Sequence, residues 1–98
     1  MRAPKSPCVY ILATKNDGVL YTGVTAQLLF RVPSHREGPE SSFTSRYGVY
    51  RLVWFEEYSY MDDAIIREKQ IKKWNRAWKV RLIEKSNPEW KDLFEDMG

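Results

Sequence analysis

An acidic residue falls within an apolar helical stripe in the second half of the chain. After Tyr60, a spacing of three and four residues gathers apolar side chains on one side of a predicted helix, and Glu68 lies in their midst. The apolar members are Met61, Ala64, Ile65 and Ile71. An ionised carboxylate that faces a core is costly unless a cation offsets its lost hydration. The pattern therefore predicts a divalent cation at Glu68, with a buried arginine partner or an edge-exposed side chain as alternatives.

A guanidinium has a comparable position earlier in the chain. Arg31 follows Leu28 on one predicted helix face, which also holds Val32 and His35. A guanidinium held among apolar neighbours has the rigid fork that binds phosphate oxygens. The alternative is an arginine whose stem packs while its head reaches water.

Two tyrosines flank a strong turn pattern at Asn16-Asp17-Gly18. In the expected hairpin register Leu12 faces Tyr21 and Tyr10 faces Gly23, so both phenols project from one face of the sheet. A shift of one residue would separate them, and a pair of core-edge aromatics is the alternative reading. Gly23 lacks a side chain, which allows a ligand or another backbone to approach closely.

The elements that must position these residues follow the order β-β-α-β-α-α-α. This order predicts an α+β fold with a small three-stranded antiparallel sheet flanked by helices. The strands are expected over residues 8–13, 19–24 and 50–58, and the helices over residues 26–32, 60–75, 77–84 and from 88 onward. Thr25, Ser59 and Asn87 are the expected N-caps. Pro33 should end or kink the first helix near Val32.

Length and composition indicate one domain. The chain has 98 residues, which we divide into a flexible tail over 1–7, the domain over 8–94 and a C-terminal tail over 95–98. Cys8 is the one cysteine, so no internal disulfide can form, and it is expected to be buried as a small apolar residue. The sequence shows neither a secretory apolar segment nor a run of about 20 apolar residues, so we expect a cytoplasmic protein without a membrane partner.

Positive charge is concentrated in the second half of the chain. Residues 67–85 contain eight Lys or Arg and two Glu, a local charge of +6, against a net charge of +3 for the whole chain. Such a stretch is typical of a surface that meets a phosphate-rich partner. An ordinary solvated helix face is the alternative.

Taken in order, these residues resemble the GIY-YIG nuclease superfamily. Val9-Tyr10-Ile11 and Tyr21-Thr22-Gly23 look like its two hairpin triplets, with Val in place of Gly and Thr in place of Ile. The likeness covers about residues 8–93 and is strongest to stand-alone, one-domain bacterial members. It continues through Leu20–Thr25, Arg31 with His35, Phe43–Tyr47, Leu52–Glu56, Arg67–Trp74 and Asn87–Leu93.

The resemblance implies a metal-dependent endonuclease that hydrolyses phosphodiester bonds in DNA, with RNA left open as a partner. It implies one divalent metal, Mg²⁺ or Mn²⁺, held by Glu68. The catalytic residues that it implies are Tyr10, Tyr21, Arg31, His35 and Asn87. A tyrosine would position or deprotonate water, Arg31 would bind the non-bridging oxygens, and His35 would assist proton transfer. Flanking phosphates would be bound by Lys69, Lys72, Lys73, Arg76 and Lys79.

Two other functions stay open at this point. One is a nucleic-acid-binding module that has the fold and little or no catalysis. The other is a protein-interaction domain that uses the Trp-rich C-terminal half. Trp74 and Trp78 are expected to pack in the core, with stacking of one of them on an unpaired base as the alternative. For the nuclease, we expect selectivity for DNA structure, such as branched, nicked or single-stranded DNA, rather than for sequence.

Overall fold

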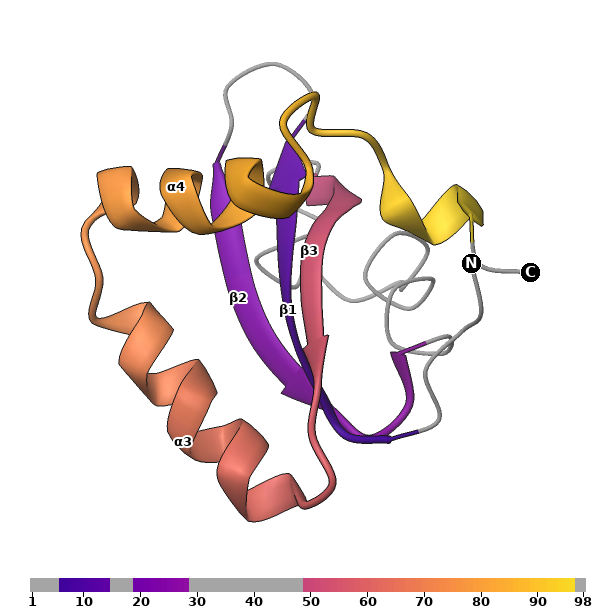
Figure 1. The fold of residues 1–98 in the computed structure, drawn as a ribbon, viewed down its shortest axis with the longest axis vertical. Helices are drawn as coiled ribbons and strands as arrows, with labels where there is room; N and C mark the ends of the chain where they lie inside the picture. The colour runs from indigo at the N-terminus through magenta and orange to yellow at the C-terminus, as the bar shows by residue number, and fades with distance from the viewer. Residues whose placement is uncertain (1–5, 15–18, 29–48, 97–98) are drawn as a thin grey trace.

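The computed structural model describes residues 6–14, 19–28 and 49–96. Three strands form one antiparallel sheet with the order β2-β1-β3 (Figure 1). The strands are β1 (Cys8–Thr14), β2 (Leu20–Thr25) and β3 (Val49–Glu57). After β3 come α3 (Met61–Lys72), α4 (Arg76–Ser86) and the 3₁₀ helix η1 (Leu93–Asp96). The predicted α+β fold with a three-stranded antiparallel sheet is confirmed.

The central strand β1 is buried along its whole length, which is the burial expected of a strand covered on both faces. Successive side chains of a strand point to opposite faces, so β1 supplies residues to two separate apolar clusters. The first, which we call the tyrosine face, consists of Cys8, Tyr10, Leu12, Leu28 and Leu52. The second, which we call the helix face, consists of Val9, Ile11, Ala13, Val53, Trp54, Ala64, Ile71 and Ile83.

A bulge in β3 sets which of its residues reach each face. Ile11 pairs with Trp54 and Leu12 pairs with Leu52, so Val53 is an extra residue in the ladder. Because of the extra residue, Val53 and Trp54 both lie on the helix face, although they are consecutive. The predicted burial of this strand on both sides is confirmed, but strict alternation does not describe it.

The helix face is covered by α3 and α4; in Figure 1, α4 crosses the strands and α3 runs beside β2. The N-cap of α3 is Tyr60, which makes no side-chain capping bond. The prediction of a Ser59 cap is therefore wrong, because Ser59 lies one residue before the position whose side chain could bond the first turn. The helix ends at Lys72, where the N–H groups of Lys73 and Trp74 turn back to carbonyls three residues earlier. Asn75 then caps α4, and its Oδ1 accepts a hydrogen bond from the Trp78 N–H at 3.0 Å.

The C-terminal segment differs from its prediction. Asn87 ends α4 instead of opening a new helix, and a turn follows it. The Asn87 Oδ1 accepts the Lys91 N–H at 3.0 Å, and Trp90 adopts a left-handed φ of 56°, which no helix accommodates. The predicted helix from Pro88 is therefore wrong. A single short 3₁₀ helix begins only at Leu93.

The end of β2 also differs in detail. The Thr25 Oγ1 accepts the Gln27 N–H at 3.0 Å, so Thr25 stabilises a turn there. Helical backbone first occurs at Leu28 rather than at Ala26. The rest of the helix predicted over 26–32 lies outside the described residues. In the described ranges, no helix combines the length and the apolar character needed to span a bilayer.

Candidate active site

The two tyrosines of the hairpin lie together on the tyrosine face. The β1–β2 register pairs Tyr10 with Gly23 and Leu12 with Tyr21, as predicted. The centroids of the two phenol rings are 6.3 Å apart and the ring planes are tilted by 40°. This geometry is a favourable aromatic contact, and it brings two phenolic hydroxyls to one part of the sheet.

Gly23 makes this arrangement possible. A Cβ atom at residue 23 would lie 2.5 Å from the hydroxyl oxygen of Tyr10 and 2.6 Å from its Cζ. The Tyr10 ring therefore occupies the space in which any other residue at 23 would place its side chain. The close approach predicted at Gly23 is made by the Tyr10 phenol, rather than by a ligand or another backbone.

The two phenols differ in exposure. Tyr10 is 0% exposed and belongs to the buried cluster itself, whereas Tyr21 is half-buried and packs against that cluster from outside. Only Tyr21 of this pair therefore reaches solvent. The sequence did not distinguish between them, because both occupy equivalent positions in the strand alternation.

Glu68 faces the sheet, as the apolar stripe predicted. Its neighbours on the stripe, Ala64 and Ile71, are buried in the helix face, and the Glu68 side chain is only 12% exposed. Its Oε2 lies 2.7 Å from the Nζ of Lys72, one helical turn on. The positive charge beside this carboxylate is thus a lysine on the same helix. Within the described ranges, no arginine is paired with this carboxylate, whereas Arg31, Arg36 and Arg46 lie outside those ranges.

The described residues do not bring Glu68 into contact with the tyrosine pair. The phenols project from the tyrosine face, whereas α3 packs on the helix face. The two parts share one strand, since Tyr21 lies on β2 and α3 packs against β2 as well as β1. In Figure 1, α3 runs beside β2, which is an edge strand of the sheet. A substrate that contacts both the tyrosine pair and Glu68 would therefore have to bind at the edge of β2.

The carboxylate oxygens of Glu68 fit a magnesium or manganese ion whose remaining ligands are water and substrate phosphate. Among the described residues, no group of three metal-ligating side chains occurs. Mg²⁺ does not require such a group, because it keeps several waters and binds through one or two carboxylates plus substrate phosphates. Glu68 offers one hard carboxylate at the border between core and solvent.

Asn87 has a structural role at the end of α4. It is 5% exposed, and its Nδ2 donates to the carbonyl oxygens of Val53 at 3.0 Å and Lys91 at 2.9 Å. Its Oδ1 accepts the Lys91 N–H. Both side-chain N–H groups are therefore used to join the end of α4 to β3 and to the following turn. Its predicted catalytic role stays a prediction, and nothing in its contacts favours it.

Two predicted catalytic residues, Arg31 and His35, lie outside the described residues. The predicted phosphate-binding residues lie on or between α3 and α4. Lys69, Lys73 and Arg76 are exposed and Lys79 is half-buried, whereas Lys72 is the partner of Glu68. The basic stretch is thus largely a solvent-facing surface.

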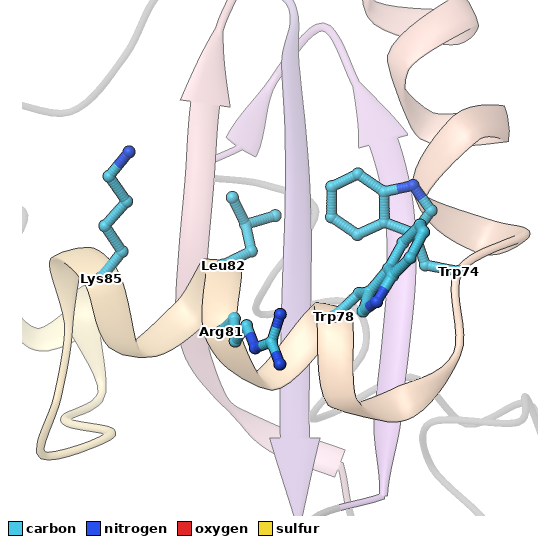
Figure 2. A pocket seen from close by; sticks show the side chains of 5 residues that line it. All are labelled: Trp74, Trp78, Arg81, Leu82 and Lys85. Atoms are coloured by element: carbon cyan, nitrogen blue, oxygen red, sulfur yellow. The ribbon is translucent and has the colours of Figure 1, made fainter.

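The tryptophans between these basic residues divide between two environments. Trp74 is half-buried and packs against the helix face, as predicted. Trp78 is 52% exposed, so the core packing expected of it is wrong, and Figure 2 shows it beside Trp74 where α3 meets α4.

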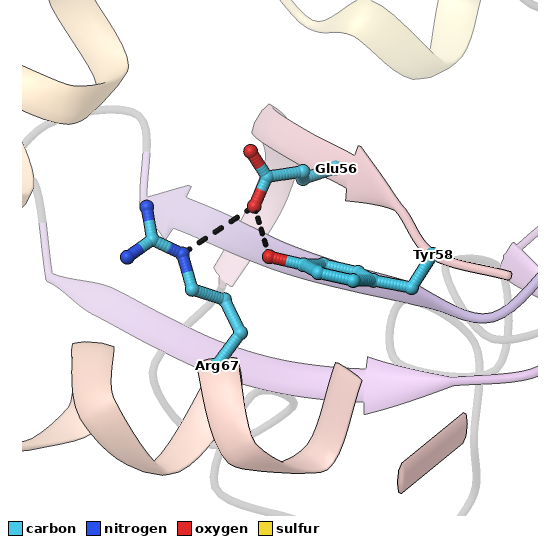
Figure 3. A network of polar contacts seen from close by, with 3 residues as sticks. All are labelled: Glu56, Tyr58 and Arg67. Atoms are coloured by element: carbon cyan, nitrogen blue, oxygen red, sulfur yellow. Dashed lines mark hydrogen bonds and ion pairs between the residues drawn. The ribbon is translucent and has the colours of Figure 1, made fainter. Parts of the chain in front are cut away.

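A polar network that the sequence did not indicate joins β3 to α3 (Figure 3). The Tyr58 hydroxyl donates to Oε1 of Glu56, and the Arg67 Nε lies 3.4 Å from the same oxygen. The Arg67 guanidinium also lies over the Trp74 ring, 5.2 Å from its centroid. Burial, together with the bond to the Glu56 carboxylate, raises the pKa of Tyr58 to about 12. Glu56 and Tyr58 are close in sequence, whereas Arg67 is eleven residues from Glu56 and is brought to it by the tertiary fold.

Comparison with known proteins identifies the family. A family model described as the GIY-YIG catalytic domain matches residues 6–81, which include both tyrosines and Glu68 but not Asn87. The UPF0213 protein CPE1444 of Clostridium perfringens is 40% identical over 75 residues, covering 76% of this chain and 80% of its own. The UPF0213 protein SERP0126 of Staphylococcus epidermidis is 36% identical over 76 residues, covering 78% and 92%.

A solved structure has the same fold. The solution NMR structure of the UPF0213 protein BH0048 from Bacillus halodurans matches with a TM-score of 0.57 and 29% identity, covering 88% of this chain and 90% of that one. The family model spans most of the chain, and the relatives align over most of their own lengths. The chain therefore belongs to the GIY-YIG nuclease family.

Proposed function

We propose that this protein is a divalent-metal-dependent endonuclease that hydrolyses phosphodiester bonds in DNA and selects for DNA structure rather than sequence. The observation that carries the proposal is the tyrosine pair. The ring centroids of the two phenols are 6.3 Å apart, and the Tyr10 ring occupies the space that a side chain at residue 23 would need. The chain belongs to the GIY-YIG family. Core packing alone does not require a second, half-exposed phenol at this place.

In this proposal the two tyrosines have different roles. Tyr21 acts on the attacking water, because it is the phenol of the pair that reaches solvent. Tyr10 is a positioning residue, because it is fully buried and its ring contacts the ring of Tyr21. This assignment follows from exposure, which the sequence pattern did not give.

Glu68 holds the metal in this proposal. When bound, Mg²⁺ or Mn²⁺ screens the phosphate charge and assists the leaving oxygen. Lys72, which is 50% exposed and lies 2.7 Å from the Glu68 carboxylate, would move toward solvent or a substrate phosphate when the metal binds. Arg31 binds the non-bridging oxygens and His35 assists proton transfer, roles that come from the family resemblance.

Selectivity for DNA structure follows from the basic surface of α3 and α4. Exposed Lys and Arg side chains contact phosphates, which carry no sequence information. A strand that is unpaired or bent at a branch can bring its backbone to the edge of β2 more easily than a straight duplex can.

A cleavage panel tests the proposal. Duplex, nicked, flap, junction and single-stranded DNA are incubated with Mg²⁺, with Mn²⁺ or with EDTA, using the wild type and the variants Tyr21→Phe, Glu68→Ala and Arg31→Ala. Glu89→Gln is the matched control, because Glu89 also pairs with a lysine, at 3.1 Å, but on an exposed turn. We expect cleavage only with metal, and a loss of at least about a hundredfold in the three variants but not in the control.

Two outcomes would count against the proposal. Equal cleavage by all the variants would show that these residues do not form the centre. Salt-sensitive binding without cleavage of any substrate would instead support a nucleic-acid-binding module with this fold.

A further inference from the structure

A hollow of about 280 Å³ lies where α3 meets α4, on the side of the molecule that the helices cover. Its lining combines apolar and cationic side chains: Trp74, Trp78, Arg81, Leu82 and Lys85. Figure 2 shows the two indoles at one end of the hollow, with Lys85 at the other. The candidate active site uses none of these five residues.

The two indoles form a corner rather than a closed stack. Their centroids are 6.0 Å apart and their planes meet at 76°. Trp78 is 52% exposed, which is unusual for the largest apolar side chain. In the described part of the chain, neither indole N–H donates a hydrogen bond, whereas the Trp90 Nε1 donates to Glu84 at 2.8 Å.

Neighbouring residues hold this corner in place. The Asn75 side chain caps α4 at the N–H of Trp78 itself, which fixes the backbone from which that ring projects. The Arg67 guanidinium lies 5.2 Å from the Trp74 centroid, and Arg67 is held in turn by Glu56. An exposed aromatic surface that is already ordered loses little conformational freedom on binding.

The charge around the hollow limits what can fill it. Arg81 and Lys85 are exposed cations on its rim, and Lys73 is a further exposed cation near the junction of the helices. A purely apolar partner would cover the indoles and leave these cations without counter-charges. An unpaired nucleotide matches both features, because a base offers a flat ring to stack on an indole and the flanking phosphates offer negative charge.

We propose that this hollow is a subsite for an unpaired nucleobase of single-stranded DNA, with the base stacked on Trp78 and with Arg81 and Lys85 binding the flanking phosphates. The subsite rests on the proposed function for the identity of the polymer. Because α4 packs on the helix face, the subsite is separated by the sheet from Tyr10 and Tyr21. It therefore anchors a strand on the face of the sheet that also holds Glu68, and it gives the enzyme a physical reason to prefer DNA with an unpaired segment.

The test measures binding without cleavage. A fluorescein-labelled oligothymidylate and an abasic oligonucleotide of the same length are titrated in EDTA with the wild type, Trp78→Ala and Trp78→Phe. Tyr60→Ala is the matched control, since Tyr60 is an aromatic residue that is 71% exposed and lies outside the hollow. Far-UV circular dichroism checks that each variant is folded.

We expect Trp78→Ala to weaken oligothymidylate binding about tenfold, and Trp78→Phe to weaken it about threefold at most. On the abasic strand, both variants should bind as the wild type does. Arg81→Ser with Lys85→Ser should lower the slope of log K against log salt by about 1.4, because each contact to a single-strand phosphate contributes about 0.7.

Unchanged oligothymidylate binding by folded Trp78→Ala would overturn the subsite, as would an equal loss on the abasic strand. Since no metal is present, the result does not depend on catalysis. Base-dependent binding by a protein that cleaves no substrate would support the subsite and contradict the nuclease proposal. Normal cleavage, with no base-dependent loss in Trp78→Ala, would support the nuclease proposal and contradict the subsite.

Discussion

The two faces of the sheet are built in different ways. On the tyrosine face, the chemistry lies on the strands themselves: Tyr10 and Tyr21 come from neighbouring strands and contact each other directly. On the helix face, the strands supply apolar packing, and the polar groups of interest, Glu68 and the rim of the hollow, lie on α3 and α4.

The tyrosine face holds its side chains rigidly, whereas the charged groups on the helix face can change partners. The ring of Tyr10 is fixed because it fills the space above Gly23 and is fully buried. The ion pair of Glu68 can open, because the Lys72 side chain is 50% exposed and flexible. The protein thus has a rigid hydroxyl site on one face, and on the other a carboxylate whose partner can exchange for a metal.

The largest effect should come from removing the exposed phenol. We expect Tyr21→Phe to lower the cleavage rate by about 10²–10⁴-fold, because it removes the group that acts on the water. Tyr10→Phe should lower it much less, since that hydroxyl is buried. Single-turnover cleavage with Mg²⁺ measures both rates. A larger loss for Tyr10→Phe than for Tyr21→Phe would reverse the roles assigned within the tyrosine face.

The next effect concerns the connection between α4 and β3. We expect Asn87→Ala to lower the free energy of unfolding by about 3 kcal/mol, because it leaves the buried Val53 carbonyl and the turn at Lys91 without their partner. Urea denaturation measures the change. A variant of normal stability that has lost cleavage would show instead that Asn87 acts in catalysis.

A smaller effect is expected at Gly23. Gly23→Ala places a methyl group 2.5 Å from the Tyr10 hydroxyl oxygen, so the ring must move. We expect a loss of about 1–3 kcal/mol in the free energy of unfolding, together with a lower cleavage rate because the tyrosine pair is displaced. The double variant Gly23→Ala with Tyr10→Leu is the control, and it should recover part of the stability. No loss in the single variant would contradict the tight packing of this face.

The smallest effect is a loss of stability at alkaline pH. It involves one residue from each face, Cys8 on the tyrosine face and Tyr58 on the helix face. Burial, with the nearby charge of Glu57, raises the pKa of Cys8 from 9.0 to about 12, and the pKa of Tyr58 rises from 10.0 to about 12. The native state therefore holds protons that the unfolded chain has released. Stability should be fully present below pH 9 and should fall from there toward pH 12.

Denaturation midpoints at pH 8 and pH 11 measure this change. Cys8→Ala and Tyr58→Phe should each lose less stability between the two pH values than the wild type loses. A fall as steep in both variants as in the wild type would mean that other groups cause it.

Much of the candidate site was predictable because it depends on local periods. The sequence pattern Asn16-Asp17-Gly18 and the two-residue alternation of the strands predict the register, and the register alone places Tyr10 and Tyr21 together. The helical period likewise places Glu68 with Ala64 and Ile71. The family resemblance agreed with both placements.

The remainder depends on contacts between elements that are distant in sequence. Neither the Tyr10 ring over Gly23 nor the difference in exposure between the two phenols follows from a strand pattern. Asn87 has the local appearance of a helix start, and only the Val53 carbonyl and the turn at Lys91 make it a helix end. Such roles are set by which element packs beside which.

The most direct test of the account asks whether the two faces serve one centre. Cleavage rates with Mg²⁺ are measured for the wild type, Tyr21→Phe, Glu68→Gln and the double variant. Residues that act in one reaction are strongly non-additive, so the double variant should lose about as much as the more damaging single variant. If the two losses multiply, or if neither single variant loses activity, the tyrosine pair and the α3 carboxylate do not form one nuclease site.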